Sequence, residues 1–167
     1  MLKNKLFSRK DAVDYALEYA INKNPQYFDY TNSGGNCTNY ISQCLYAGTK
    51  TMNYNKNNGW FYISPSNTSI SWANVEPFYN FLTTNKGVGP FASDSTLEIV
   101  EIGDIIQLKF SNTLVFSHSL IITKIDERTP DGIFICANTK DVKNVPLSHY
   151  NYKEYRLIHI LGYRVNE

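Results

Sequence analysis

At residues 34–43 the chain reads Gly-Gly-Asn-Cys-Thr-Asn-Tyr-Ile-Ser-Gln. After the glycine pair and Cys37, the apolar residues follow a helical spacing, which predicts a helix over residues 37–46 with Asn36 as its N-cap. Cys37 would then lie on the first turn, where unpaired backbone N–H groups and the helix dipole favour a thiolate. This stretch therefore predicts a cysteine nucleophile, and the rest of the sequence is searched for the partners that such a nucleophile needs.

The order of the other predicted elements indicates the fold class. Helical spacing also recurs over residues 8–24 and 75–84, whereas the second half of the chain changes to strand-like segments bounded by turn residues. Helices followed by strands are typical of the α+β class, with the helices packed on a C-terminal antiparallel sheet. We predict a single domain over residues 8–164, whose strands cover residues 104–110, 117–125, 132–137 and 153–162.

Composition excludes several classes of function. The net charge is +1 and no run of Lys and Arg occurs, so we expect no nucleic-acid partner. No apolar run is long enough for a membrane span, and the N-terminus lacks the apolar core of a secretory signal. We therefore expect a chain that is cytoplasmic as synthesised, or a domain excised from a secreted protein. A monomer is the expected state.

The cysteines favour neither a disulfide nor a metal site. Cys37 and Cys44 are two helical turns apart, about 10 Å, which is too far for a disulfide bond. Together with His118 they also lack the spacing of a zinc site, so Cys44 is interpreted as a small buried residue. We predict that the protein uses no metal and no cofactor.

Three histidines compete for the role of general base. His118 begins an apolar strand, so it is predicted at the rim of the sheet, where a helix N-terminus can meet it. His149 lies in a polar loop, and His159 lies within an apolar strand, where the backbone can satisfy it. Asn138 ends the next strand and could fix the tautomer of His118, with Asp141 as the alternative orienting residue or a simple turn residue.

Six sequence blocks together carry a resemblance: Asn24 to Tyr27, residues 34–44, residues 71–75, Gly103-Asp104, residues 118–123 and residues 138–141. They resemble the bacterial putative amidase domain family. That family is similar to the papain-like group that contains the NlpC-type and CHAP cell-wall hydrolases. The resemblance implies a papain-like fold, with Cys37 as nucleophile and His118 as base. Where the family usually reads His-Thr-x-Asp, this chain begins with Asn138, and Asn is the orienting residue of papain-like peptidases.

The expected chemistry is acyl transfer through a thioester. The Cys37 sulfur would attack an amide carbon, and the Cys37 N–H would stabilise the oxyanion. Tyr30 is the first choice for the second oxyanion donor and Asn36 the second choice. Trp72 lies in a matching block and either packs in the core or lines a substrate cleft.

These expectations lead to a cysteine amidase or peptidase. Bacterial cell-wall peptides, that is peptidoglycan, are the expected substrate, and the cell wall is the expected site of action. Two alternatives are open. An amine could replace water in taking the acyl group, which would make the protein a transglutaminase-like acyltransferase. The cleft could also serve a catalytically silent cell-wall binding module.

Overall fold

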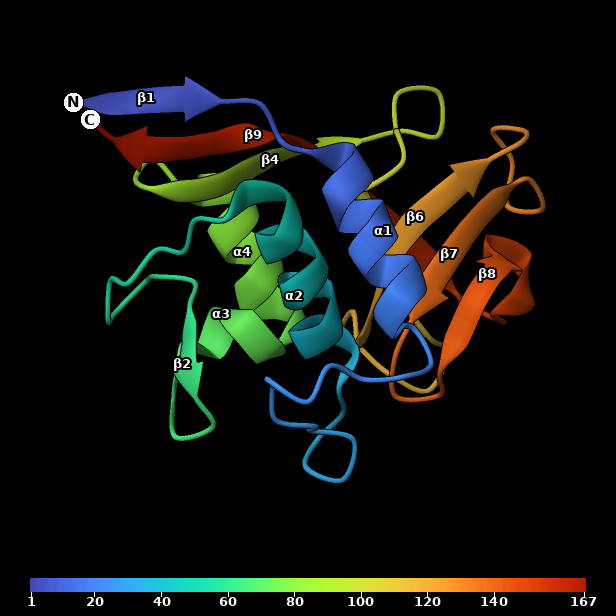
Figure 1. Ribbon diagram of the computed structural model, residues 1–167. Coiled ribbons are helices and arrows are strands. Elements are labelled where there is room, and N and C mark those ends of the chain that lie inside the picture. The colour runs from blue at the N-terminus through green and yellow to red at the C-terminus, as the bar shows by residue number, and fades with distance from the viewer.

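A computed structural model describes residues 1–167 and has the predicted α+β class. The helices lie together beside a large sheet (Figure 1). The helical elements are α1 (Arg9–Tyr19), α2 (Cys37–Thr49), α3 (Ile70–Ala73), α4 (Val75–Thr84) and the short 3-10 helix η1 (Leu147–His149). The strands are β1 (Leu2–Lys5), β2 (Tyr62–Ser64), β3 (Asn67–Thr68), β4 (Gly89–Ser95), β5 (Ile105–Lys109), β6 (His118–Ile125), β7 (Ile133–Ala137), β8 (Val142–Pro146) and β9 (Glu154–Asn166).

One seven-stranded sheet organises the fold. Its strands follow the order β1-β9-β5-β6-β7-β8, and β4 also pairs with β9. Every pairing is antiparallel. The last strand, β9, pairs with β1, β4 and β5. Its pairing with β1 brings the N-terminal strand and the C-terminus side by side (Figure 1). The strands β2 and β3 form a separate two-stranded hairpin.

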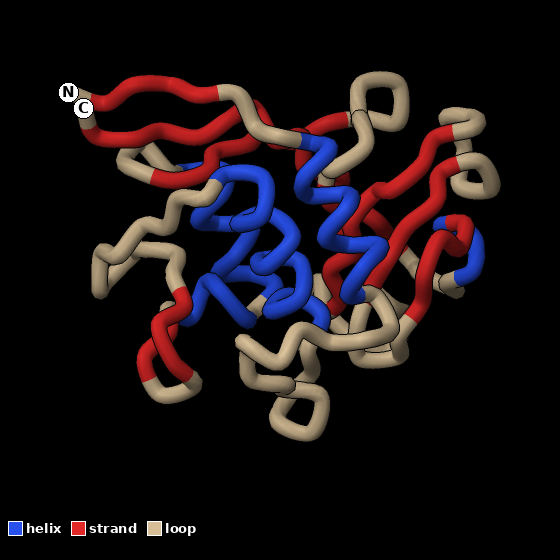
Figure 2. Tube along the Cα trace, viewed as in Figure 1, coloured by secondary structure: helices blue, strands red, loops and turns tan.

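The alternation of apolar residues divides the core between the two faces of the sheet. Ile105, Ile121 and Ile158 pack with the helices in the larger cluster. Their neighbours in sequence, Ile106 and Leu120 among them, pack in a second cluster on the opposite face. Figure 2 shows helices α1 to α4 gathered together and the short η1 apart from them, with long loops closing one end of the molecule. None of these helices combines the length and the apolar character needed to cross a membrane.

Two helices differ in length from the sequence prediction. Ser8 caps α1, its hydroxyl accepting from the Asp11 N–H, but the helix ends at Tyr19 rather than at the predicted residue 24. Helix α2 continues past Gly48 to Thr49, and Lys50 at φ 51° provides its C-cap. A Cβ at Gly48 would lie 2.3 Å from the Phe7 ring, so this glycine permits close packing rather than ending the helix.

Three strands of the main sheet were not predicted. The sequence signals at β4 and β8 are weak, because each contains polar residues and a proline, Pro90 in β4 and Pro146 in β8. β1 is exposed along its whole length and pairs with β9 only. These strands form because they pair with distant parts of the chain, and not because of a local apolar pattern.

Candidate active site

Three segments far apart in the sequence meet at one end of the molecule. The N-terminus of α2, the beginning of β6 and the end of β7 converge at the lower end of Figure 1. The Thr38 hydroxyl lies 2.9 Å from that of Ser119, and the Asn36 N–H donates to the Thr139 hydroxyl at 2.7 Å. Cys37 precedes Thr38 and His118 precedes Ser119, so these bonds bring the predicted nucleophile and base together.

A cavity of about 370 Å³ opens over this junction, and Cys37 and His118 both line it. Cys37 keeps 9% of its surface accessible, whereas Cys44 and Cys136 are completely buried. The cavity is therefore a place where a small part of a substrate could reach one thiol of the three. Its walls are Gly34, Gly35, Cys37, Phe110, Ser117, His118, Thr139, Lys140 and Tyr150.

The surroundings of Cys37 keep the thiol protonated. Burial raises the pKa of the Cys37 thiol, and hydrogen bonds from the Ser119 N–H and the Thr38 hydroxyl oppose this rise. The Cys37 N–H donates to no oxygen in the protein, as expected at the first turn of a helix, and its own sulfur is the one acceptor within reach. The site therefore combines a neutral thiol with an unused backbone donor beside it.

His118 is also neutral in this structure. Burial lowers the pKa of the half-buried ring to about 4. Its Nε2 lies 3.2 Å from the Tyr150 hydroxyl. Burial, with Cys37 nearby, raises the pKa of Tyr150 to about 12, so this residue is a neutral phenol that can donate or accept. The second ring nitrogen, Nδ1, has no hydrogen-bond partner and is not among the buried unpaired atoms.

Asn138 lies close to the site, but its amide is bonded elsewhere. Its oxygen accepts from the Asn36 side chain at 3.0 Å, and its nitrogen donates to the Ala20 carbonyl at 2.8 Å. The hydrogen bond of His118 goes instead to Tyr150. Asn138 thus ties the loop before α2 to the end of β7, and it does not hold the histidine ring in this structure.

Asn36 occupies the N-cap position of α2 without capping it through its side chain. Its side-chain oxygen accepts from the Tyr30 N–H and from the Asn39 amide, and its own N–H is taken by Thr139. The predicted side-chain cap is therefore wrong, because the Asn36 oxygen accepts from the Tyr30 N–H and the Asn39 side chain and not from a backbone N–H of the helix. The Asn36 backbone N–H is therefore occupied, and one N–H of its side-chain amide donates to the Asn138 oxygen at 3.0 Å.

Two further predicted residues point away from the cavity. The Tyr30 hydroxyl approaches the Pro65 carbonyl at 3.5 Å, and its N–H is bonded to Asn36, so the structure leaves it no free donor near Cys37. Asp141 forms an ion pair with Lys23 at 3.2 Å and does not contact His118.

Trp72 is a core residue. It has no accessible surface, and its indole N–H donates to the Asn39 side-chain oxygen at 2.9 Å. Its ring packs against Trp60 with centroids 4.8 Å apart. The alternative that Trp72 lines a substrate cleft is therefore wrong, because the rings of Tyr27, Trp60 and Tyr62 pack against it and leave none of its surface accessible.

The other two histidines take no part in the cavity. His149 is exposed on η1, as its polar surroundings predict. His159 bonds through Nδ1 to the buried Asp104 at 2.6 Å, and Arg9 pairs with the other oxygen of this carboxylate at 2.7 Å. The cluster around Asp104 fastens the beginning of α1 to β9 on a separate part of the sheet.

Sequence reasoning missed two residues of the site. Thr139 accepts from the Asn36 N–H while its backbone holds φ at 94°, a left-handed conformation unusual for a β-branched residue. Tyr150 follows η1 and supplies the partner of His118. Thr139 lies in the block already singled out at residues 138–141, but one tyrosine among 13 gave no local signal.

A buried polar network supports the junction from behind. The Ser119 hydroxyl accepts from the Gln107 amide at 3.2 Å as well as contacting Thr38. Gln107 in turn accepts from the Arg156 guanidinium at 2.8 Å, and Arg156 pairs with Glu76. Because each buried group is paired, this chain of bonds fixes the spacing between α2 and β6.

Comparison with known proteins identifies relatives. A family model described as a putative amidase domain matches residues 7–161. The uncharacterized protein YhbB of Bacillus subtilis is 32% identical over 124 residues, which are 72% of this chain and 38% of that protein. The uncharacterized protein YjcM of the same bacterium is 26% identical over 155 residues, covering 89% of this chain and 34% of that protein. The chain thus matches little more than a third of these relatives' length. No solved structure matches it significantly.

Proposed function

Because this chain belongs to the putative amidase domain family, we propose that it hydrolyses amide bonds with Cys37 as the nucleophile. The observation that carries this proposal is the shared cavity, in which one partly accessible thiol at a helix N-terminus lies beside a histidine. Family membership suggests amide hydrolysis in general terms. The residues of the cavity are the basis for the cysteine mechanism.

In the proposed mechanism, the reaction begins from a neutral pair. Both pKa shifts disfavour ionisation, so His118 removes the thiol proton as the sulfur attacks the amide carbon. The new C–S bond forms as the carbonyl becomes an oxyanion. The unused Cys37 N–H is a donor for that oxyanion. The Thr139 hydroxyl is a second, because it accepts from Asn36 and keeps its own proton available.

Two proton transfers by His118 complete the proposed cycle. The protonated ring gives its proton to the leaving amine as the C–N bond breaks, which leaves a thioester on Cys37. The neutral ring then takes a proton from water, whose oxygen attacks the thioester carbon. Breaking the C–S bond releases a carboxylic acid, and the proton on His118 returns to the Cys37 sulfur.

Tyr150 is the residue that we assign to orient His118. For Nδ1 to accept the thiol proton, Nε2 must carry a hydrogen, and the Tyr150 oxygen at 3.2 Å can accept from it. This assignment gives Tyr150 the role expected for Asn138. Asn138 then acts indirectly, because it holds the Asn36 side chain and the loop before α2 in place beside Cys37. Asp141 stays with Lys23 as a structural pair.

A papain-like arrangement is part of the proposal. The nucleophile on the first turn of α2, packed against a sheet strand that begins with His118, supports it. We further propose that the amide belongs to a bacterial cell-wall peptide. The cavity is open on one side, and its lining includes both glycines of the 34–35 pair, so an extended peptide could lie across it.

Selective alkylation tests the nucleophile. Iodoacetamide should modify Cys37 faster than Cys44 or Cys136, since these two are completely buried. Because the pKa of the Cys37 thiol is raised, the rate should still increase above pH 7. Equal labelling of the three thiols would overturn the proposal.

Digestion of purified peptidoglycan tests the reaction. The chain should release new free amino groups, Cys37→Ala should release none, and Cys44→Ala is the matched control that retains activity. Amine-capped or cross-linked products without new amino groups would mean acyl transfer. An unchanged wall that nevertheless binds the protein would mean a silent binding module.

A further inference from the structure

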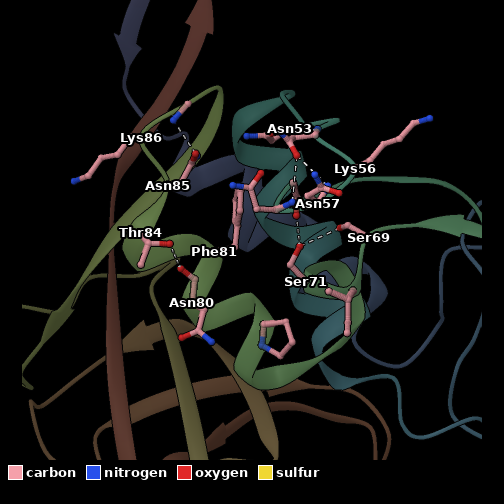
Figure 3. Close-up of a pocket in the computed structure, with 16 residues that line it drawn as sticks. Asn53, Lys56, Asn57, Ser69, Ser71, Asn80, Phe81, Thr84, Asn85 and Lys86 are labelled. Atoms are coloured by element: carbon pink, nitrogen blue, oxygen red, sulfur yellow. Dashed lines mark hydrogen bonds between the residues drawn. The ribbon is translucent and has the colours of Figure 1, made fainter.

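A second cavity, lined by asparagine side chains, lies apart from the Cys37 cavity. It has a volume of about 550 Å³ and is formed between the loop at residues 53–59 and the C-terminal half of α4 with the turn at residues 85–87. Figure 3 shows the two walls, with Asn57 on one and Asn80 on the other. The size is within the range of small-molecule sites.

The frame of this asparagine pocket is fixed by internal hydrogen bonds. Asn53 ties the two walls together, its amide donating to the Val88 carbonyl at 2.9 Å. Asn85 holds the turn through the Val88 and Pro90 carbonyls at 3.0 and 2.9 Å. A Cβ at Gly59 would lie 2.3 Å from two backbone oxygens of the loop, so only glycine fits there. The pocket is thus preorganised before any ligand arrives.

Three other asparagines have side chains that make no hydrogen bond within the protein. Asn57, Asn58 and Asn80 are exposed, line the pocket, and make no hydrogen bond through their side-chain amides. Each amide offers two donors and one acceptor oxygen in a fixed plane. Such groups can pair with neighbouring hydroxyls and with an acetamido group.

The charged ends of the residues that line this pocket lie outside its hollow. Lys56 and Lys86 contribute to the walls, but their ammonium ends extend away from the hollow in opposite directions (Figure 3). No acidic residue lines the cavity. The polar groups that line it are mainly asparagine amides, together with the hydroxyls of Ser71 and Thr84, which already donate to the Gly59 and Asn80 carbonyls.

A path of shared surface connects this pocket to Cys37. Ser69 and Ile70 line both the asparagine pocket and an intermediate cavity. That intermediate cavity shares Gly34 and Gly35 with the Cys37 cavity. Ile70 is 68% exposed and lines the first two cavities, so it offers an apolar contact along the path. One elongated ligand could therefore occupy all three hollows.

We propose that the asparagine pocket binds a neutral, N-acetylated oligosaccharide. Asn57 and Asn58 contact it from one wall and Asn80 from the other. The saccharide is the glycan portion of a substrate whose peptide portion reaches Cys37, and this link between the two portions rests on the proposed function. Saccharide binding by the pocket itself does not depend on the chemistry of Cys37.

A binding measurement on the Cys37→Ala chain tests the proposal. Triacetylchitotriose is titrated into the full chain labelled with nitrogen-15, and the side-chain amide resonances of asparagine are followed. We expect the resonances of Asn57, Asn58 and Asn80 to shift. Asn58→Ala and Asn80→Ala should each weaken binding about fivefold, the effect of one lost hydrogen bond. Asn22→Ala is the matched control, because Asn22 is exposed, lies outside every cavity described and should leave binding unchanged.

Three results would overturn the proposal. These are the absence of shifts, binding unaffected by both pocket variants, and tighter binding of trigalacturonate, which would indicate an anion site. Failure of the proposed function is distinguishable from these results. In that case Cys37 would not be alkylated selectively, but triacetylchitotriose would still shift the pocket resonances.

Discussion

Acidification should destabilise this protein through His118. Burial lowers the pKa of His118 from 6.5 to about 4, so the folded protein resists protonation that the unfolded chain accepts. Below pH 6.5 the unfolded state therefore binds more protons, and the free energy of unfolding falls until about pH 4. The pKa falls by about 2.5 units, and at about 1.4 kcal/mol per unit this corresponds to a loss of at most about 3.5 kcal/mol in the free energy of unfolding. The actual loss should be smaller, because the ring is only half-buried.

Urea denaturation of the chain and of His118→Gln at pH 7, 6, 5 and 4 measures this loss. The variant should lack the His118 contribution, so its stability should fall less steeply between pH 6.5 and pH 4. His149→Gln, at an exposed histidine outside the cavity, is the matched control and should retain the original pH dependence. The reasoning is refuted if His118→Gln has the same pH dependence, or if the His118 ring protons titrate near pH 6.5 by NMR.

Three other substitutions have definite expected outcomes. Thr139→Val should lower the free energy of unfolding by about 1–3 kcal/mol in urea denaturation, because it leaves the Asn36 N–H unpaired, while Thr139→Ser should preserve stability. Asp104→Asn should lower the free energy of unfolding by about 3–5 kcal/mol in thermal unfolding, because it breaks a buried ion pair with Arg9. It should leave the rate of Cys37 alkylation unchanged, and slower alkylation would contradict the structural separation of Asp104 from the Cys37 cavity. Trp72→Phe should lower the free energy of unfolding by about 1–3 kcal/mol without changing KM. A raised KM would mean that Trp72 contacts the substrate.

Local sequence patterns contained much of the fold. Helix α4 matches the predicted bounds of residues 75–84, since its apolar residues recur at one spacing and glycines follow it. The strands β5, β6 and β7 were predictable because each is a short apolar segment bounded by turn residues. The polar strand β4 was not, because its pairing with β9 is decided by contacts between distant parts of the chain.

In the candidate site, too, local patterns predict the positions of some residues, whereas long-range contacts decide their partners. Cys37 and His118 each begin a regular element, so the sequence could place both at element ends, and the structure brings those ends to one cavity. The partners of these residues are set by long-range hydrogen bonds. The contact between Tyr150 and His118 joins residues 32 positions apart, and that between Asn36 and Thr139 joins residues 103 apart. No local pattern encodes either contact.

The most direct test of the account is to identify the covalent intermediate. The chain is mixed with purified cell-wall peptides, quenched in acid and digested, and the cysteine-containing peptides are analysed by mass spectrometry. We predict an acyl group on Cys37, none on Cys44 or Cys136, and slower acylation in His118→Gln. Release of free amino groups by Cys37→Ala, or turnover with no acyl group on Cys37, would contradict the account.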